Sequence, residues 1–102
     1  MDKQENFDGL FVYAVYDKKA NKYDIPFFAA SDLFARRRFL LMANDQGTIL
    51  NQFLKDFDLH LVGSFDVHSG ICTNMEKTVV EGLQIIQQIK KNEQIQLGGN
   101  NK

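Results

Sequence analysis

The segment Leu10–Tyr16 is apolar at every position, and β-branched and aromatic residues dominate it. Because both alternating sets of side chains are apolar, this run predicts a strand that is buried on both faces. The chain has 102 residues, which is enough for one domain with little left for a second. We therefore expect a single domain at residues 10–97, with a loose lead-in at residues 1–9 and a frayed tail at residues 98–102.

Two β-hairpins are predicted around polar turns. In the first, the polar run Lys18–Lys22 separates the apolar strand from a returning strand at Tyr23–Phe28. Pro26 has no backbone N–H, so this returning strand should lie at a sheet edge or be irregular. The second hairpin is expected to consist of a strand, a turn and a short returning strand at Leu59–Phe65, Asp66–Gly70 and Ile71–Cys72.

Two helices are expected between the hairpins. Ser31 or Asp32 can cap a helix that runs from about Asp32 to Asn44, because a short side-chain oxygen accepts from the free N–H groups of the first turn. This helix is apolar on more than one side, which indicates either a subunit interface or a second packed element. The segment Ile49–Phe57 is expected to form a short second helix.

A third helix is expected at the C-terminal end. Thr73 and Glu76 fit a capping box, and the helix that they open would continue to about Leu97, with Gly98 in the stop position. The predicted fold class is α+β, with two β-hairpins forming a small antiparallel sheet. A central helix and a C-terminal amphipathic helix pack with this sheet.

Charge and cysteine content narrow the choice of compartment and partner. The formal net charge is -1, so binding to nucleic acid would require a local basic patch. Cys72 stands alone and cannot form an internal disulfide, which is typical of a reducing cytoplasm. The apolar runs Leu10–Tyr16 and Phe39–Ala43 are both far shorter than the ~20 residues that span a bilayer. The N-terminal residues are polar, without an apolar signal segment. We expect a soluble, unexported protein with no membrane partner.

The sharpest local feature is the triplet Arg36, Arg37 and Arg38 on the predicted central helix. Three guanidinium groups on one helix could contact phosphates, and Phe34 or Phe39 could assist by stacking on bases. The alternative is a solvated helix face with salt bridges to some of the thirteen acidic residues.

A second basic group, Lys18, Lys19 and Lys22, crowds the first hairpin turn. Such a turn could follow a nucleic-acid backbone, or it could be an ordinary soluble turn. Tyr16, at the end of the preceding strand, is a further candidate for base stacking, as is Phe34.

Metal binding and catalysis are not expected. The side chains of His60, Asp66, His68 and Cys72 suit zinc, but their spacing matches no standard metal site. Ser64, Asp66 and His68 supply the residue types of a nucleophilic triad, but spacing this short along a strand and a turn rarely gives the geometry. We therefore predict no catalytic residue, no metal ligand and no cofactor.

Several blocks of the chain resemble one viral family. The run Tyr16–Ala20, then Pro26–Phe28, then a helix with Ala35, Arg37 and Phe39, is similar to the small nonstructural protein of gokushovirus-like microviruses, which are phages with single-stranded DNA genomes. The later run Asp56–Asp66, followed by Ser69 and Gly70, resembles the second signature of that family. In order, these blocks cover about 60 of the 102 residues.

The resemblance implies a nonstructural, DNA-binding phage protein in the host cytoplasm, with a role in moving replication towards single-stranded genome synthesis. The matching positions that could touch DNA are Lys18 and Arg37. Local charge adds the remaining basic residues of the turn and of the arginine triplet. The matching aromatic positions are Tyr13, Tyr16, Phe27 and Phe28, for which a place in the core is the alternative.

Two hypotheses follow. The first is a non-catalytic protein that binds single-stranded DNA through Lys18, Lys19, Lys22, Arg36, Arg37 and Arg38, and forms a homodimer that presents two such patches to one strand. The alternative is a dimeric interaction module that binds a phage or host replication protein, or a capsid-assembly protein, without touching DNA. Salt should separate them, because phosphate contacts weaken as salt rises and apolar contacts do not.

Overall fold

The computed structural model describes the backbone of residues 9–100 and the side chains of residues 9–92. Residues 1–8 of the predicted lead-in and residues 101–102 of the predicted tail lie outside this range. The strands are β1 (Gly9–Asp17), β2 (Lys22–Tyr23), β3 (Phe27–Ala29), β4 (Phe57–Asp66) and β5 (Cys72–Glu81). The helices are α1 (Asp32–Ala43), α2 (Ile49–Gln52), the 3₁₀ helix η2 (Leu54–Asp56) and α3 (Gly82–Asn100).

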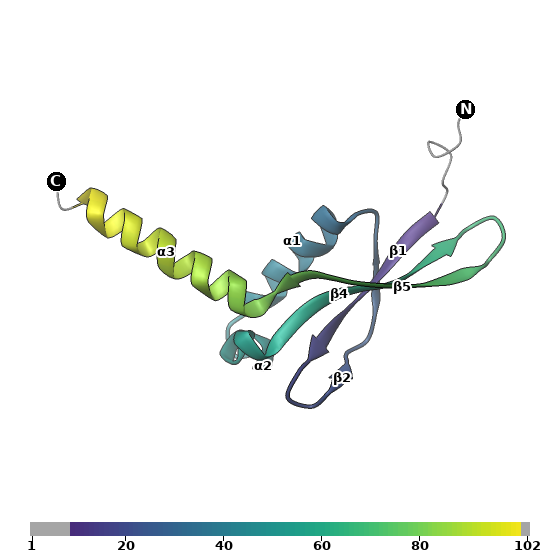
Figure 1. The fold of residues 1–102 in the computed structure, drawn as a ribbon, viewed down its shortest axis with the longest axis horizontal. Coiled ribbons are helices and arrows are strands. Elements are labelled where there is room, and N and C mark those ends of the chain that lie inside the picture. Colours follow the sequence, from purple (N-terminus) through teal and green to yellow (C-terminus); the bar gives the residue numbers. More distant parts are fainter. Residues whose placement is uncertain (1–8, 101–102) are drawn as a thin grey trace.

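The five strands form one antiparallel sheet with the order β2-β1-β4-β5, and β3 also pairs with β1 (Figure 1). β2 and β3 both pair with β1, and Pro26 lies in the gap between them. The returning strand of the first hairpin is therefore an interrupted edge, as the missing N–H of Pro26 predicts. The predicted α+β class, with two hairpins, a central helix and a C-terminal helix, is confirmed.

The core lies between one face of the sheet and the helices. Tyr13 from β1, Leu59 from β4 and Phe39 from α1 have no exposed surface. Ala35 and Ala43 lie one turn before and one turn after Phe39, and both are buried. Because their side chains are small, α1 can approach the strands closely. Leu54 from η2 and Ile85 from α3 complete the same cluster at the end of the sheet.

A polar contact fastens the first turn of α1 to two strands. The Tyr13 hydroxyl donates to Asp32 Oδ1 over 2.7 Å, and Lys77 Nζ of β5 lies 2.5 Å from Asp32 Oδ2. Burial, reinforced by the bond to Asp32, raises the pKa of Tyr13 well above its ordinary value. The bond from Lys77 and then that from Tyr13 lower the pKa of Asp32, against a smaller opposing effect of desolvation. Asp32 is therefore held as a carboxylate between two donors.

The second hairpin is much longer than predicted. Cys72–Glu81 is a ten-residue strand, so the expected two-residue strand at Ile71–Cys72 was too short. The helix predicted to open at Thr73 with a capping box to Glu76 is wrong, because these residues pair with β4, with Ser64 opposite Thr73. Two register shifts in this ladder disturb the alternation that would identify the strand from its sequence.

Two further helix boundaries differ from expectation. The segment predicted as one helix at Ile49–Phe57 divides into α2 and η2, and Phe57 begins β4 because its ring is buried opposite Asp17. α3 runs to Asn100, so the predicted stop at Gly98 lies inside the helix.

Gly82 is the junction at which β5 becomes α3. A Cβ atom there would overlap the carbonyl oxygens of Leu54 and Phe57, and the Gly82 N–H donates to the buried carboxylate of Asp58 over 3.3 Å. Only a residue without a side chain fits between these groups. Gly82 thus fixes where α3 starts and how closely its first turn lies against η2.

Gly82→Ala is expected to destabilise the fold. The added methyl meets backbone atoms that have no flexible end to move, so the free energy of unfolding should fall by about 1–3 kcal/mol or more. Urea unfolding followed by circular dichroism measures the change. Gln88→Ala, on the exposed side of the same helix, is the control and should shift stability by less than about 0.5 kcal/mol. Equal stability of the two variants would contradict the close approach at Gly82.

Asp32→Asn is expected to lower stability by about 1 kcal/mol at neutral pH, because the charged hydrogen bonds of Asp32 become neutral. The lowered pKa means that this contribution is full above the ordinary carboxyl pKa of 3.8 and is lost as pH falls through the folded value. The stability gap to the native chain should therefore close in acid, as measured by urea unfolding across pH. Lys19→Gln, at an exposed turn lysine, is the control. A gap that stays constant below pH 3.8 would argue against this role.

Candidate nucleic-acid interface

The arginine triplet is presented by α1, whose start is set by Ser31. The Ser31 hydroxyl accepts from the Phe34 N–H over 3.4 Å. The acidic Asp32 lies in the first turn, where its negative charge interacts favourably with the positive end of the helix dipole. The buried positions of α1 recur every fourth residue on one side. Arg36, Arg37 and Arg38 therefore fan out at ~100° steps around the remaining surface.

All three arginines are exposed. Within the part of the chain that the structure describes, none of them forms an ion pair with a carboxylate. The alternative of a helix face neutralised by salt bridges is thus not seen in this part of the chain. Three unneutralised guanidinium groups lie within one helical turn, which gives a local positive charge on a chain whose net charge is -1.

The three side chains differ in their neighbours. The Arg38 guanidinium lies 4.5 Å from the centre of the Phe27 ring, over its face, on the β3 side of α1. Arg36 and Arg37 each line a groove between α1 and α3. Phe34, the predicted stacking residue of this helix, is 54% exposed. The structure therefore combines the arginines with a free aromatic ring on the same helix.

In the lysine turn, Lys18 forms an ion pair and Lys22 lies near acidic side chains, whereas Lys19 does neither in the described part of the chain. The Asp17 carboxylate accepts from the backbone N–H groups of Lys19 and Ala20, and Lys18 Nζ lies 3.4 Å from Asp58. Lys22 borders a pocket together with three aspartates, which are Asp17, Asp24 and Asp45. Lys19 is exposed and has no carboxylate partner in the described residues.

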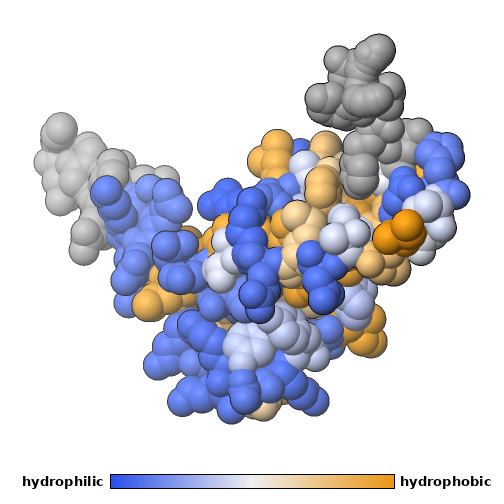
Figure 2. Space-filling view, turned by 45° about the vertical axis from the view of Figure 1, so that its right-hand side comes forward, coloured by the Kyte–Doolittle hydropathy of each residue, from blue (hydrophilic) through white to orange (hydrophobic). Residues whose placement is uncertain are grey.

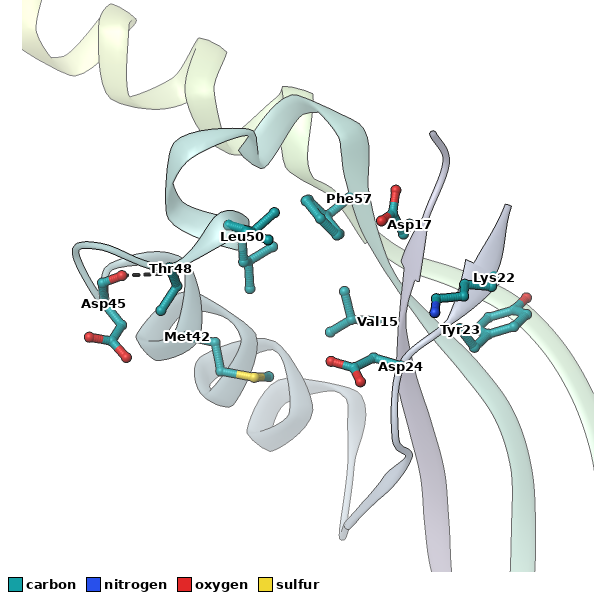
Figure 3. Close-up of a pocket in the computed structure, with 11 residues that line it drawn as sticks. Val15, Asp17, Lys22, Tyr23, Asp24, Met42, Asp45, Thr48, Leu50 and Phe57 are labelled. Carbon is teal, nitrogen blue, oxygen red and sulfur yellow. Dashed lines mark hydrogen bonds between the residues drawn. The ribbon is translucent and has the colours of Figure 1, made fainter. Parts of the chain in front are cut away.

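The pocket beside Lys22 includes none of the three arginines in its described lining. It has a volume of 490 Å³ and an apolar lining that includes Val15, Met42 and Phe57, with Lys22 near Asp17 on the strand side and Asp45 on the opposite side (Figure 3). The lysine turn thus faces the C-terminal end of α1 and the segment that follows it. The structure does not join the lysines and the arginines into one continuous basic surface.

Tyr16 lies on the opposite face of the sheet from α1. Its ring stacks on His60 with centroids 5.3 Å apart and meets Tyr23 at 4.7 Å, and the Tyr23 hydroxyl bonds His60 Nδ1 over 2.9 Å. Tyr16 and Phe34 therefore belong to different surfaces and cannot stack on neighbouring bases of one short segment. Of the two predicted stacking residues, Phe34 is the one that accompanies the arginines.

Among the candidates for metal binding and catalysis, Asp66 is engaged within its own turn and Cys72 is an exposed free cysteine. Asp66 accepts from the Ser69 hydroxyl and N–H within the turn, and the hydroxyl bond lowers the pKa of Asp66 most strongly. Ser64 lies on β4 opposite Phe11 and Thr73. Among the described residues, no group of three His, Cys, Asp or Glu side chains is placed to hold a metal ion.

One partner of the arginines was missed by local sequence reasoning. Phe27 was assigned to a strand and, through the resemblance, to an aromatic position, but no spacing relates it to Arg38. The two meet because α1 packs beside β3 after the sheet has formed. The residues of α3 that border the grooves beside Arg36 and Arg37 lie far along the chain from α1, and no spacing relates them to the arginines.

Comparison with known proteins gives a family. The model for the Phage ORF5 protein family matches residues 10–85, which include all five strands and α1. No curated protein and no solved structure matches the chain. Within the described residues, no helix is both long enough and apolar enough to cross a membrane. Since the family model covers most of the sequence and the whole sheet, the chain belongs to the Phage ORF5 protein family.

Proposed function

We propose that this phage protein is a nonstructural protein of a gokushovirus-like microvirus that binds single-stranded DNA without catalysis. It would act inside the host cell, in viral genome replication or in the switch to single-stranded genome synthesis. The observation that carries the proposal is the group of three exposed arginines on α1, which have no carboxylate partners in the described residues and share the helix with the exposed ring of Phe34.

The proposed mechanism is phosphate neutralisation combined with stacking. Arg36 and Arg37 would contact successive phosphates with their forked donors, and Phe34 would stack on an unpaired base, a contact worth ~1–3 kcal/mol. Arg38 is steadied by the Phe27 ring, so less side-chain entropy is lost when it binds. Stacking on Phe34 requires an unpaired base, which favours a single strand over a duplex.

In this proposal the lysine turn contributes less to DNA binding than the arginines do. Lys18 and Lys22 already lie beside aspartates, so neutralising a phosphate would compete with those carboxylates. Lys19 is the freest cation of the turn. In a homodimer, which we also propose, the turns and the arginine helices of two copies would act along one strand and raise the affinity through avidity.

A second candidate function is favoured by one observation. On the outer face of α1, Leu41 is 74% exposed and Leu33 is 61% exposed. Exposed apolar side chains of this size are typical of a protein-binding surface and have no role in contacts with phosphate. The protein would then be an interaction module whose partner is a replication or capsid-assembly protein. Its binding would bury apolar surface and change little with salt.

The proposed function is tested by the triple variant Arg36→Gln, Arg37→Gln and Arg38→Gln. Each lost phosphate contact should lower the slope of log affinity against log salt by about 0.7, so the triple variant should lose about 2 units of slope and most of its affinity. Fluorescence anisotropy of a labelled oligothymidine, between about 50 and 200 mM salt, measures both quantities. A duplex of the same length shows the strand preference.

The control variant is Lys55→Gln, which removes an exposed charge from η2. Its affinity should stay close to that of the native chain. An unchanged affinity in the arginine variant would refute the proposal that α1 binds DNA. No binding of the native chain at low salt would refute DNA binding itself and favour the interaction module.

A separate prediction addresses self-association. Leu41→Ser should shift a homodimer towards monomer if the exposed face of α1 is the contact, because burial of a leucine contributes ~1.5–3 kcal/mol. Light scattering coupled to size exclusion measures the mass across a range of concentrations. Ile25→Ser, which alters an equally exposed residue between β2 and β3, is the matched control. An identical mass for both variants and the native chain would exclude α1 as the contact.

A further inference from the structure

α3 leaves the body of the protein at a fixed angle. Its first turn is held by Gly82 and by Ile85, which is 93% buried against the core, while the rest of the helix projects away from the sheet (Figure 1). The described part of α3 presents mainly hydrophilic side chains on the face shown in Figure 2. Among the side chains of this helix that the structure describes, Ile85 is the only buried apolar one and Ile86 packs partly against the core, although a helix is usually kept in place by a longer apolar stripe.

A polar groove lies where α3 diverges from α1. Its volume is 340 Å³, and the buried side chains of Val80 and Ile85 lie at its base. The polar residues that line it come from both helices and are Arg36, Gln84, Gln87, Gln88 and Lys91. We refer to this feature as the α1–α3 groove.

The four polar residues of α3 that line the groove form one stripe. Gln84 and Gln88 are four positions apart, as are Gln87 and Lys91, and residues separated by three or four positions lie on the same side of a helix. Arg36 of α1 faces this stripe. The groove therefore has a regular wall of amides ending in a cation, opposite a guanidinium group.

The chemistry of these groups favours an anion with several oxygen acceptors. Arg36 and Lys91 can only donate, the glutamine amides can both donate and accept, and no carboxylate lines the groove among residues 9–92. A second groove, which Ile85 also borders, is mainly apolar, and Arg37 and Asn44 are its polar lining residues in the described part of the chain. A phosphodiester backbone offers charged oxygens to the cations and sugar or base edges to the amides.

We propose that the α1–α3 groove, walled by Gln84, Gln88 and Lys91 opposite Arg36, holds the sugar–phosphate backbone of single-stranded DNA. This inference rests on the proposed function and extends it to α3. The strand would pass from the arginines of α1 into the groove. α3 then acts as the second wall of the binding site, and Gln84, Gln87 and Gln88 are the amides that it presents towards Arg36.

The test uses two variants of α3, which leave the arginines of α1 untouched. Lys91→Gln should lower the salt slope for oligothymidine by about 0.7, which corresponds to a roughly fivefold loss of affinity at ~0.1 M salt. The double variant Gln84→Glu and Gln88→Glu places two carboxylates beside the strand and should weaken binding further. All three residues are exposed, and circular dichroism should show an unchanged fold.

Matched controls alter the same charges outside the groove. Lys90→Gln removes the neighbouring cation of α3, which does not line the groove, and the pair Gln46→Glu and Gln52→Glu adds two carboxylates at exposed sites. These variants should bind with affinity and slope close to those of the native chain. Equal losses in the groove variants and in their controls would overturn the proposal, because general charge would then explain both.

The remaining outcomes distinguish a failure of the groove proposal from a failure of the proposed function. If the arginine triple variant loses binding while both α3 variants keep native affinity and slope, the groove proposal is wrong and the proposed function stands. If the native chain does not bind oligothymidine at low salt, both are wrong. Displacement of the DNA by oligoglutamate at equal charge concentration would also overturn the groove proposal, since the groove would then hold any polyanion.

Discussion

The close packing of α1 on the sheet is the constraint on which the rest of the structure depends. Small residues at positions 35 and 43 let the helix approach, Phe39 fills the space above Tyr13 and Leu59, and Asp32 binds donors from two strands. This arrangement fixes the rotation of the helix about its own axis. With that rotation set, the arginines have no buried position open to them and must face solvent and the neighbouring elements.

Local charge and net charge lead to different conclusions for this chain. Acidic and basic residues nearly cancel overall, yet they are not evenly mixed. Aspartates gather around the lysine turn, while the groups that line the grooves of Arg36 and Arg37 are apolar, amide or cationic. An overall charge near zero therefore says little about the field at one helix. The family assignment, which covers residues 10–85, includes α1 but leaves most of α3 outside.

Much of the fold could be predicted from the sequence, and the errors have a common physical cause. The apolar run at β1, the Pro26 interruption and the Ser31 cap are decided by neighbouring residues, so local reasoning located them. β5 is decided by its ladder with β4, whose register shifts hide the alternation of its side chains. Gly82 ends the strand because of carbonyl groups from another part of the chain, which spacing along the sequence does not reveal.

The same distinction applies to the candidate site. The arginine triplet and the exposure of Phe34 follow from helical geometry and could be predicted, because the core side of α1 is evident from its spacing. The ring of Phe27 under Arg38 and the amides opposite Arg36 depend on how separate elements meet. Local patterns also placed Tyr16 with Phe34 as stacking residues, although alternation along β1 sends Tyr16 to the other face of the sheet.

The two edges of the sheet have a consequence for how copies of this chain meet. One edge is broken into β2 and β3, so it offers only short runs of free backbone groups. The other is β5, ten residues long, whose outer backbone groups pair with no described strand. Such an edge invites strand addition, but charged Glu76, Lys77 and Glu81 and the two irregularities of its ladder make it a poor template. The chain can thus carry a long open strand without polymerising through it.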